Sequence, residues 1–309
     1  MKPPPFEYHR PTTLDETLAL LVRHGSEARV LAGGQSLLPM MKLRLARPAV
    51  LVDLNRVHEL AYVRADDGAL AFGAMARLSE LESETIRARH PMLAAAAPHI
   101  GHRAIRHRGT ICGSLAHADP AAELPVLALA LDAELRVASP SGERTVAAQN
   151  FFVTYFTTSL GSGEVLREAR FPLPPPGSGW SFKELARRHG DYALASVAAL
   201  LDVGVDGTIT RARVVLGSVA DRALRSLDAE ATLVGHAGTP TVFEAAAAAA
   251  AARLDPPTDV HGSGAYRREI ARVLVERSLL EAWSRAQHLT PSFGGAPMRP
   301  GGGVRYTPC

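Results

Sequence analysis

Residues 106–125, RHRGTICGSLAHADPAAELP, place two arginines, two acids and a glycine turn flanked by hydroxyl side chains in one short stretch. Neither a nucleophile paired with its base nor a set of metal ligands is visible in it. Its centre, Thr110-Ile111-Cys112-Gly113-Ser114, is predicted to be a loop of small residues. Such loops let backbone N–H groups approach an anion closely.

An earlier stretch has the same character. Ala32-Gly33-Gly34-Gln35-Ser36 follows a predicted strand, and Gln35 and Ser36 add side-chain donors to the glycine backbone. The spacing is not the Rossmann G-x-G-x-x-G pattern, and no Walker lysine follows the glycines. Taken alone, the segment is explained equally well by a tight structural turn.

Together the two loops suggest a shared ligand. They could hold a pyrophosphate between them, with nearby arginines offsetting its negative charge. Asp119 or Glu123 could accept hydrogen bonds from ribose or ribityl hydroxyls. The residues therefore indicate a dinucleotide site built on loops, outside the Rossmann scheme.

Composition narrows the class of protein. Of the 309 residues, 47% are hydrophobic and 21% charged, as in a soluble globular protein of two or three domains. The net charge of +3 is too small to indicate nucleic acid. Two distant cysteines, Cys112 and Cys309, exclude a disulfide framework and any four-cysteine iron–sulfur or zinc site within this chain.

No membrane span or export signal is expected. No apolar run approaches the roughly 18 residues that a membrane span needs. The first residues, MKPPPFEYHRP, lack the apolar core of a signal peptide. We therefore expect a cytoplasmic protein.

The order of predicted elements indicates an α+β fold in two blocks. A capping-box pattern at Thr13 and Glu16 predicts a helix that stops at Gly25. Beyond it, PLPPPGSG at 172–179 predicts a linker, because consecutive prolines sustain neither a helix nor a central strand. The expected strands are 28–33, 48–55, 69–74, 131–138, 164–171, 195–204 and 212–219, and the further expected helices 78–97, 241–253 and 264–287.

Three motifs carry a resemblance to a known family. AGGQSLLPMMKLRLARPAVLVDLN, IRHRGTICGSLAHADPAAELP and SFKELARRHGDYALASVAA together resemble the FAD-binding medium subunit of molybdenum hydroxylases, the carbon monoxide dehydrogenase and xanthine dehydrogenase relatives. The similarity spans roughly residues 1–287 in the family's order and spacing.

The resemblance implies a domain plan. It predicts an FAD-binding domain of the vanillyl-alcohol-oxidase (PCMH) type at 1–176, made of α+β subdomains at about 1–56 and 57–176. A smaller α+β C-terminal domain at 177–287 would complete the flavin site, followed by a Pro/Gly-rich tail at 288–309 that we do not expect to pack.

The resemblance also implies positions that contact noncovalent FAD. The pyrophosphate would meet both loops, Glu123 would contact the cofactor, Ile100 would pack near the flavin, Leu166 would make a backbone contact, and Lys183 and Tyr192 would lie beside the isoalloxazine. The loop residues are Val30, Leu31, Ala32, Gly33, Gly34, Gln35, Ser36 and Leu37 in the first and Thr110, Ile111, Cys112, Gly113 and Ser114 in the second.

Position 112 departs from the family, which often has a second glycine there. A cysteine fits if its φ is negative; a positive φ would cost on the order of 1 kcal/mol. A covalent flavin link through Cys112, His102 or His107 is the alternative to noncovalent binding.

What the resemblance implies about function is electron transfer without a catalytic residue in this chain. A large partner subunit would carry the molybdopterin cofactor and a small one two [2Fe–2S] clusters, in a dimer of heterotrimers. Electrons would pass through FAD to an external acceptor. The alternatives are a self-sufficient FAD-dependent oxidase or reductase, for which Tyr192 is the obvious acid–base candidate, and a scaffold that has lost FAD, against which the intact glycines argue.

Docking of the iron–sulfur subunit should use basic side chains. The cluster at 102–108 is either a solvated face or a phosphate or partner contact. With the stretch ELARRH at 184–189 it forms the predicted docking surface, on which Arg106 and Arg188 are expected to be exposed.

Overall fold

A parallel sheet in the order β1–β3–β2 opens the computed structural model, which describes residues 2–66 and 68–289. Helix α1 joins β1 to β2 as predicted: its N-cap Thr13 accepts a hydrogen bond at Oγ1 from the Glu16 amide (3.1 Å), and it ends at Gly25, where φ is +53°. A short α2 follows β2. The bounds are β1 Glu7–His9, α1 Leu14–His24, β2 Ala28–Leu31, α2 Leu37–Lys42 and β3 Val50–Asp53.

The N-terminal part also contains an antiparallel sheet in the order β4–β5–β10–β6–β7. Strand β5 is buried along its whole length, as its apolar sequence predicts. A two-stranded hairpin, β8–β9, lies before β10. The bounds are β4 Val63–Asp66, β5 Ala69–Gly73, β6 Glu134–Ser139, β7 Gly142–Ala147, β8 Phe152–Thr154, β9 Thr157–Thr158 and β10 Val165–Pro172.

The helix expected over 78–97 is wrong as a single element. The chain forms a 3₁₀ helix at Leu78–Glu82, then α3 (Glu84–Arg89) and α4 (Pro91–Ala96). Ser83 caps α3 with its hydroxyl, and Pro91 opens α4. Proline at a first helical position cannot continue the helix before it, so the segment folds into short turns.

Helices α5 (Arg103–Arg106), α6 (Ile111–His117) and α7 (Glu123–Ala130) occupy the centre of the chain. All eight residues of α7 are buried, because the helix lies between the two parts of the molecule. A helix that is apolar all round is buried on every side. One end of α7 therefore brings Glu123 to the junction of the parts.

Beyond residues 173–178, an antiparallel sheet in the order β11–β12–β13–β14 begins. The predicted hairpin of β12 and β13 and the helices α9 and α10 are confirmed, whereas β11 and α8 were not predicted. The bounds are β11 Gly179–Ala186, β12 Ala193–Val203, β13 Ile209–Gly217, β14 Leu224–Arg225, α8 Leu227–Leu233, α9 Pro240–Ala252 and α10 Gly264–Leu289.

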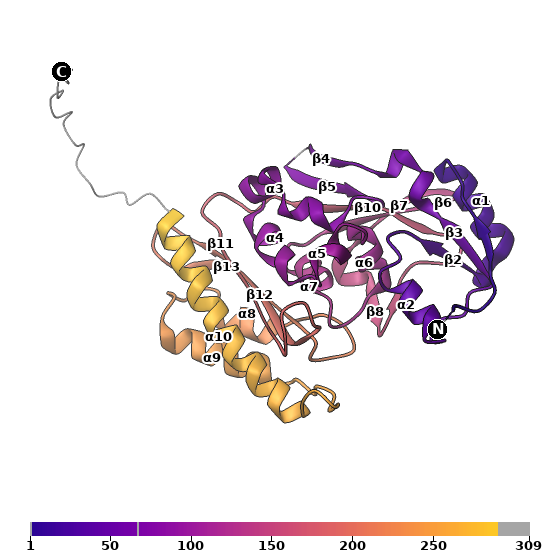
Figure 1. The fold of residues 1–309 in the computed structure, drawn as a ribbon. Coiled ribbons are helices and arrows are strands. Elements are labelled where there is room, and N and C mark those ends of the chain that lie inside the picture. Colours follow the sequence, from indigo (N-terminus) through magenta and orange to yellow (C-terminus); the bar gives the residue numbers. More distant parts are fainter. Residues whose placement is uncertain (1, 67, 290–309) are drawn as a thin grey trace, which may run out of the picture.

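Helices from both parts cover this sheet. Helix α10 lies along β11 and β12 on one face, and α7 packs against β12 and β13 (Figure 1). The expected α+β architecture is thus confirmed, with the C-terminal sheet joined to the N-terminal part through α7. The tail predicted beyond residue 289 lies outside the described residues.

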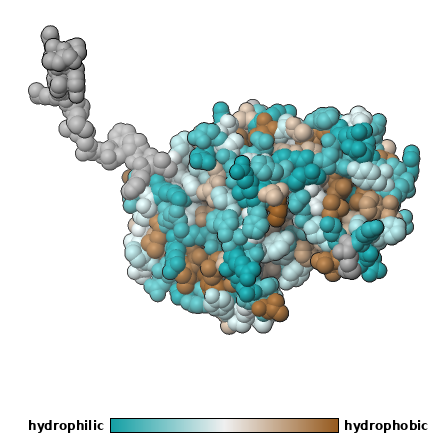
Figure 2. Space-filling model, in the orientation of Figure 1, coloured by the Kyte–Doolittle hydropathy of each residue, from teal (hydrophilic) through white to brown (hydrophobic). Residues whose placement is uncertain are grey.

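The visible face is mostly hydrophilic, with hydrophobic side chains in scattered patches (Figure 2). Within residues 2–66 and 68–289, the helices lack the combined length and hydrophobicity that crossing a membrane requires.

Candidate functional site

The two predicted glycine segments meet in space. A Cβ added to Gly33 would lie 2.3 Å from the carbonyl oxygen of Arg108 and 2.6 Å from the Cα of Gly109. The Ala32 Cβ lies 3.6 Å from the position that a Cβ on Gly113 would take. The turn after β2 and the start of α6 therefore form one continuous backbone surface.

Two side chains that the sequence analysis missed fix this contact. Asn55 donates from Nδ2 to the Ala32 carbonyl (3.0 Å), and Arg77 donates from Nη2 to Asn55 Oδ1 (2.8 Å). Arg77 also donates from Nη1 to the Arg108 carbonyl (2.5 Å). Burial, and then the charge of Arg108, lower the pKa of Arg77, yet an arginine stays charged at neutral pH. The sequence contained a signal for Asn55: it follows strand β3, which pairs with β2, the strand that leads to Gly33 and Gly34.

Gly34 supplies the turn itself. Its φ is +71°, a left-handed conformation that favours glycine, and a Cβ there would come 2.9 Å from Leu38 Cδ1. Gln35 is exposed and Ser36 is partly exposed, while Leu37 begins α2; Val30 and Leu31 lie in β2. The turn is thus packed on the protein side and accessible on the other.

The prediction that Thr110–Ser114 is a loop is wrong: it is the N-cap and first turn of α6. Thr110 Oγ1 accepts a hydrogen bond from the Gly113 amide (3.1 Å), and a Cβ on Gly113 would lie 2.5 Å from that oxygen. The helix forms because a threonine cap satisfies an otherwise unpaired N–H. The positive end of a helix suits a phosphate as well as a glycine loop does.

Cys112 points away from this surface. Its side chain is in the hydrophobic core at 2% exposure, and Sγ donates to the Phe72 carbonyl (3.5 Å). Burial raises the pKa of this thiol, so it is not a thiolate. Its φ is not positive, so the cysteine causes no backbone strain there.

Acidic residues from both parts of the molecule gather at their junction. Glu123 is 6% exposed, and burial, with smaller contributions from the carboxylates of Glu184 and Asp119, raises its pKa to about 7. Glu184 of β11 has a side chain 4% exposed and pairs with His99, at 3.3 Å between Nδ1 and Oε1. This bond raises the pKa of His99. Glu184 therefore faces the N-terminal part and does not belong to the expected docking surface.

Tyr192 precedes β12 beside the same acids. Tyr192 is 63% exposed as a whole residue. Nearby protein nevertheless desolvates its hydroxyl, and the Asp119 carboxylate acts in the same direction, so the pKa of Tyr192 is raised to about 12. Asp119 is itself held by a bond at Oδ1 from the Ala121 amide (2.9 Å). Asp119, Glu123 and Tyr192 thus converge, as a shared site requires.

The other positions that were predicted to contact FAD lie in different surroundings. Ile100 follows His99 and is buried, and its carbonyl accepts from Arg106 Nη1 (3.3 Å). Leu166 lies inside β10, opposite Val137 of β6, with its side chain in the core. Lys183 pairs through Nζ with Glu281 Oε2 of α10 (2.5 Å), away from Glu184. The structure does not bring the side chains of Leu166 and Lys183 to the acids at the junction.

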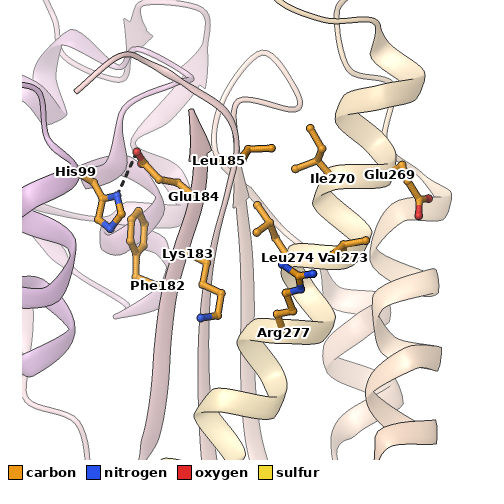
Figure 3. Close-up of a pocket in the computed structure, with 10 residues that line it drawn as sticks. All are labelled: His99, Phe182, Lys183, Glu184, Leu185, Glu269, Ile270, Val273, Leu274 and Arg277. Atoms are coloured by element: carbon orange, nitrogen blue, oxygen red, sulfur yellow. Dashed lines mark ion pairs between the residues drawn. The ribbon is translucent and has the colours of Figure 1, made fainter. Parts of the chain in front are cut away.

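A cavity of about 540 Å³ opens between β11 and α10 (Figure 3). His99 and Glu184 form part of its wall, and apolar side chains of α10 such as Ile270 and Leu274 form another. The two glycine segments do not line it. This cavity is therefore separate from the surface formed by those segments.

The expected exposure of Arg106 is wrong. This side chain is 7% exposed and ties the turn before α5 to the N-terminal part, through bonds to the Gly101 carbonyl and Glu82 Oε1 (2.9 Å each). A buried arginine must find partners, and the Ile100 carbonyl is a third one for Arg106. His102, Arg103, His107 and Arg108 remain exposed.

The two basic segments nevertheless adjoin each other. A Cβ on Gly190, after residues 184–189, would lie 2.5 Å from the His102 ring. Arg187, Arg188 and His189 are exposed beside this contact. They form, with Arg103 and Arg108, what we call the basic surface.

Comparison with known proteins gives a consistent result. The family model described as "FAD binding domain in molybdopterin dehydrogenase" matches residues 4–174, and the one described as "CO dehydrogenase flavoprotein C-terminal domain" matches 180–282. The 6-hydroxypseudooxynicotine dehydrogenase complex subunit alpha of Paenarthrobacter nicotinovorans is 43% identical over 93% of this chain and 97% of its own.

Carbon monoxide dehydrogenase gives similar values in sequence and in structure. Its medium chain from Hydrogenophaga pseudoflava is 41% identical over 92% of this chain and 99% of its own. A solved structure of that organism's enzyme superimposes with a TM-score of 0.90 at 42% identity, covering 92% of this chain and 99% of the matched chain.

Proposed function

This chain belongs to the FAD-binding medium subunits of the molybdenum hydroxylase family, and from that membership we propose how its own residues hold the cofactor and meet a partner. It is an oxidoreductase subunit: FAD is its cofactor, and the molybdenum cofactor and iron–sulfur clusters belong to partner chains. When bound, FAD would supply electron-transfer chemistry, linking the iron–sulfur clusters that relay electrons from substrate oxidation on a partner chain to an external acceptor.

The observation that carries the proposal is the contact between Gly33 and the Arg108–Gly109 backbone. There the two backbones pack with no side chain between them, next to the N-cap Thr110 of α6, and we expect an anion to approach the N–H groups of these segments. Gln35 and Ser36 offer further donors at its accessible side. These residues fit the pyrophosphate of FAD.

The acids at the junction suit the rest of the cofactor. Asp119 and Glu123 would accept hydrogen bonds from ribityl or ribose hydroxyls, while Ile100 and Tyr192 would flank the ring system. With a pKa of about 7, Glu123 is near half protonation at neutral pH and can donate as well as accept. Lys183 and Leu166 would contribute through the backbone, because their side chains are engaged elsewhere.

Tyr192 is better suited to positioning than to proton transfer. With a pKa raised to about 12, its hydroxyl stays protonated at neutral pH and is a poor base. Its exposed ring is free to pack beside a planar group. The comparisons do not favour the alternative of a self-sufficient oxidase.

The basic surface would dock the iron–sulfur subunit. Arg103 and Arg108 are exposed on the segment that contains His102, and Arg187 and Arg188 on the segment before Gly190; the contact of Gly190 with His102 joins these two segments. Exposed arginines suit an acidic partner and steer its approach. A dimer of heterotrimers in the cytoplasm completes the proposal. The matched relatives are named for carbon monoxide and for 6-hydroxypseudooxynicotine, so no substrate is carried over from them.

Expression of the chain alone and together with its partners tests this function. The chain alone should show a flavin spectrum, release FAD, and fail to oxidise the substrate of the complex. Co-expression with the molybdenum and iron–sulfur subunits should restore turnover. Substrate oxidation by the chain alone would overturn the subunit function, and a colourless chain that FAD cannot reconstitute would overturn the cofactor site.

A further inference from the structure

Three potential metal ligands lie together outside the two glycine segments. Glu7 and His9 are two residues apart on β1 and so project from the same face of the strand. His24 comes from the last turn of α1. One carboxylate oxygen and one nitrogen from each imidazole all lie within 4.8 Å of one another.

This cluster has unused capacity to bind a ligand, although His9 and Glu7 form an ion pair when the imidazole is protonated. Nε2 of His9 and Nε2 of His24 are both buried, and neither has a hydrogen-bond partner in the described part of the chain. Glu7 Oε1 lies 2.7 Å from His9 Nε2 but not in hydrogen-bond geometry. The two rings face each other at 5.2 Å between centroids. A buried imidazole nitrogen without a hydrogen bond is unfavourable, so the cluster is incomplete by itself.

We propose that Glu7, His9 and His24 form a binding site for one divalent transition-metal ion, with Zn²⁺ as the best match. Two imidazoles and one carboxylate are a ligand set that Zn²⁺ accepts, with water in the fourth position. Imidazole also favours copper and nickel, whereas Mg²⁺ and Ca²⁺ prefer oxygen ligands alone. Ligand atoms within 4.8 Å of one another must come closer together to reach bonds of about 2.0–2.2 Å to one ion, and the exposed Glu7 side chain can rotate toward the ion.

The surrounding charges limit the site to a single ion. His9, Arg10, Glu16 and Arg23 line an adjoining hollow of about 350 Å³. Glu16 is engaged, because its Oε2 accepts from the Thr12 amide (2.7 Å). The positive charges of Arg10 and Arg23 would repel a second cation. Because they also oppose any ion held by charge alone, they favour an ion that forms strong bonds to imidazole.

A bound ion would join β1 to α1. Strand β1 has three residues at the edge of its sheet, paired only with β3. Tyr8, between the two ligands, donates its hydroxyl to Asp53, whose Oδ1 accepts from the Asn55 amide (2.8 Å). The ion would therefore stabilise the edge strand from which Tyr8 reaches the network beneath Gly33. Its role is structural and separate from electron transfer.

The test uses the full chain with its flavin, treated with chelator and dialysed into metal-free buffer. Titration with ZnCl₂ in a calorimeter should show one site per chain, and Zn²⁺ should raise the thermal midpoint by mass action. His24→Gln and His9→Gln should each weaken binding at least roughly tenfold, because each removes one of three protein ligands. His58→Gln, an exposed histidine in the same part of the chain, should bind Zn²⁺ like the unmodified protein.

Two controls keep the result interpretable. The flavin content of each variant, and its thermal midpoint after chelator treatment, show whether the variant folds. If His9→Gln does not fold, His24→Gln at the end of the helix provides the test. MgCl₂ should leave the thermal midpoint unchanged. Absence of saturable Zn²⁺ binding, or its persistence in the His9→Gln/His24→Gln double variant, would overturn the site.

Discussion

Gly33 lies directly against Gly109, so closely that a single added methyl group at position 33 would come within 2.6 Å of the Gly109 Cα. Any side chain at position 33 must push the start of α6 away from the turn after β2. Gly33→Ala should therefore lower the affinity for FAD at least about tenfold, equivalent to 1.4 kcal/mol. Titration of the flavin-free chain with FAD, followed by protein fluorescence, measures this.

The matched control for that variant is Gly163→Ala. A Cβ on Gly163 meets only Val22 Cγ2, at an ordinary 3.5 Å, and its φ is not positive. It should bind FAD like the unmodified chain. Equal affinity in Gly33→Ala would show that the contact is only a structural turn.

FAD should be bound without a covalent link. Cys112 is in the core with its thiol protonated, so it cannot attack a flavin on the surface. Acid precipitation should release the yellow colour into the supernatant, and Cys112→Ala should keep the same flavin content. Colour that stays in the pellet would return attention to the exposed His102 and His107.

Glu123 should make the flavin-free chain less stable as the pH rises. Its folded pKa of about 7 lies above the ordinary 4.5, so the unfolded state releases this proton first. The contribution of Glu123 to the unfolding free energy is therefore fully present below pH 4.5, declines between pH 4.5 and 7, and is lost above pH 7. The total loss is up to about 3 kcal/mol. Glu123→Gln should flatten this part of the profile.

Urea unfolding at pH 5.5 and pH 8 measures the effect. The difference in unfolding free energy between the two pH values should be smaller in Glu123→Gln than in the unmodified chain. Glu244→Gln, an exposed acid on α9, should keep the original difference. An unchanged difference in Glu123→Gln would argue that the carboxyl is ionised in the folded chain.

Tyr192→Phe should retain electron transfer within a few-fold. The ring expected to pack beside the flavin is preserved, and a hydroxyl with a pKa of about 12 keeps its proton near pH 7 and so is a poor base. Stopped-flow reduction of the flavin in the complete complex provides the rate. A thousand-fold loss would make the hydroxyl essential and revive the self-sufficient oxidase.

Charge reversal on the basic surface should weaken docking of the iron–sulfur subunit. Arg188→Glu and Arg103→Glu place acids where an acidic partner approaches, so association should slow at low salt and differ less at high salt, where charges are screened. Surface plasmon resonance at two salt concentrations measures both rates. Lys42→Glu, on α2, is the control. If it weakens the association with the iron–sulfur subunit equally, the basic surface is not the specific docking site.

Local sequence determined those features that depend on neighbouring residues. The Thr13 cap and Gly25 stop define α1, the β12–β13 hairpin follows from its alternation and turn, and the glycines mark the segment after β2. The family motifs identified the cofactor and fold because they span both parts of the chain in register. The cap, the hairpin and each single motif are contained in a short window of sequence.

Tertiary structure alone decided which residues meet across long separations. Sequence alone predicts that Arg106 is exposed, but its bonds to Gly101 and Glu82 bury it. Glu184 pairs with His99 and so lies away from the exposed basic side chains. Thr110–Ser114 became a helix because its cap and its packing against the turn at Ala32 outweighed its glycine. Glu7, His9 and His24 converge only because β1 and α1 pack together. Burial and charge pairing are properties of the folded arrangement, and no window of sequence contains them.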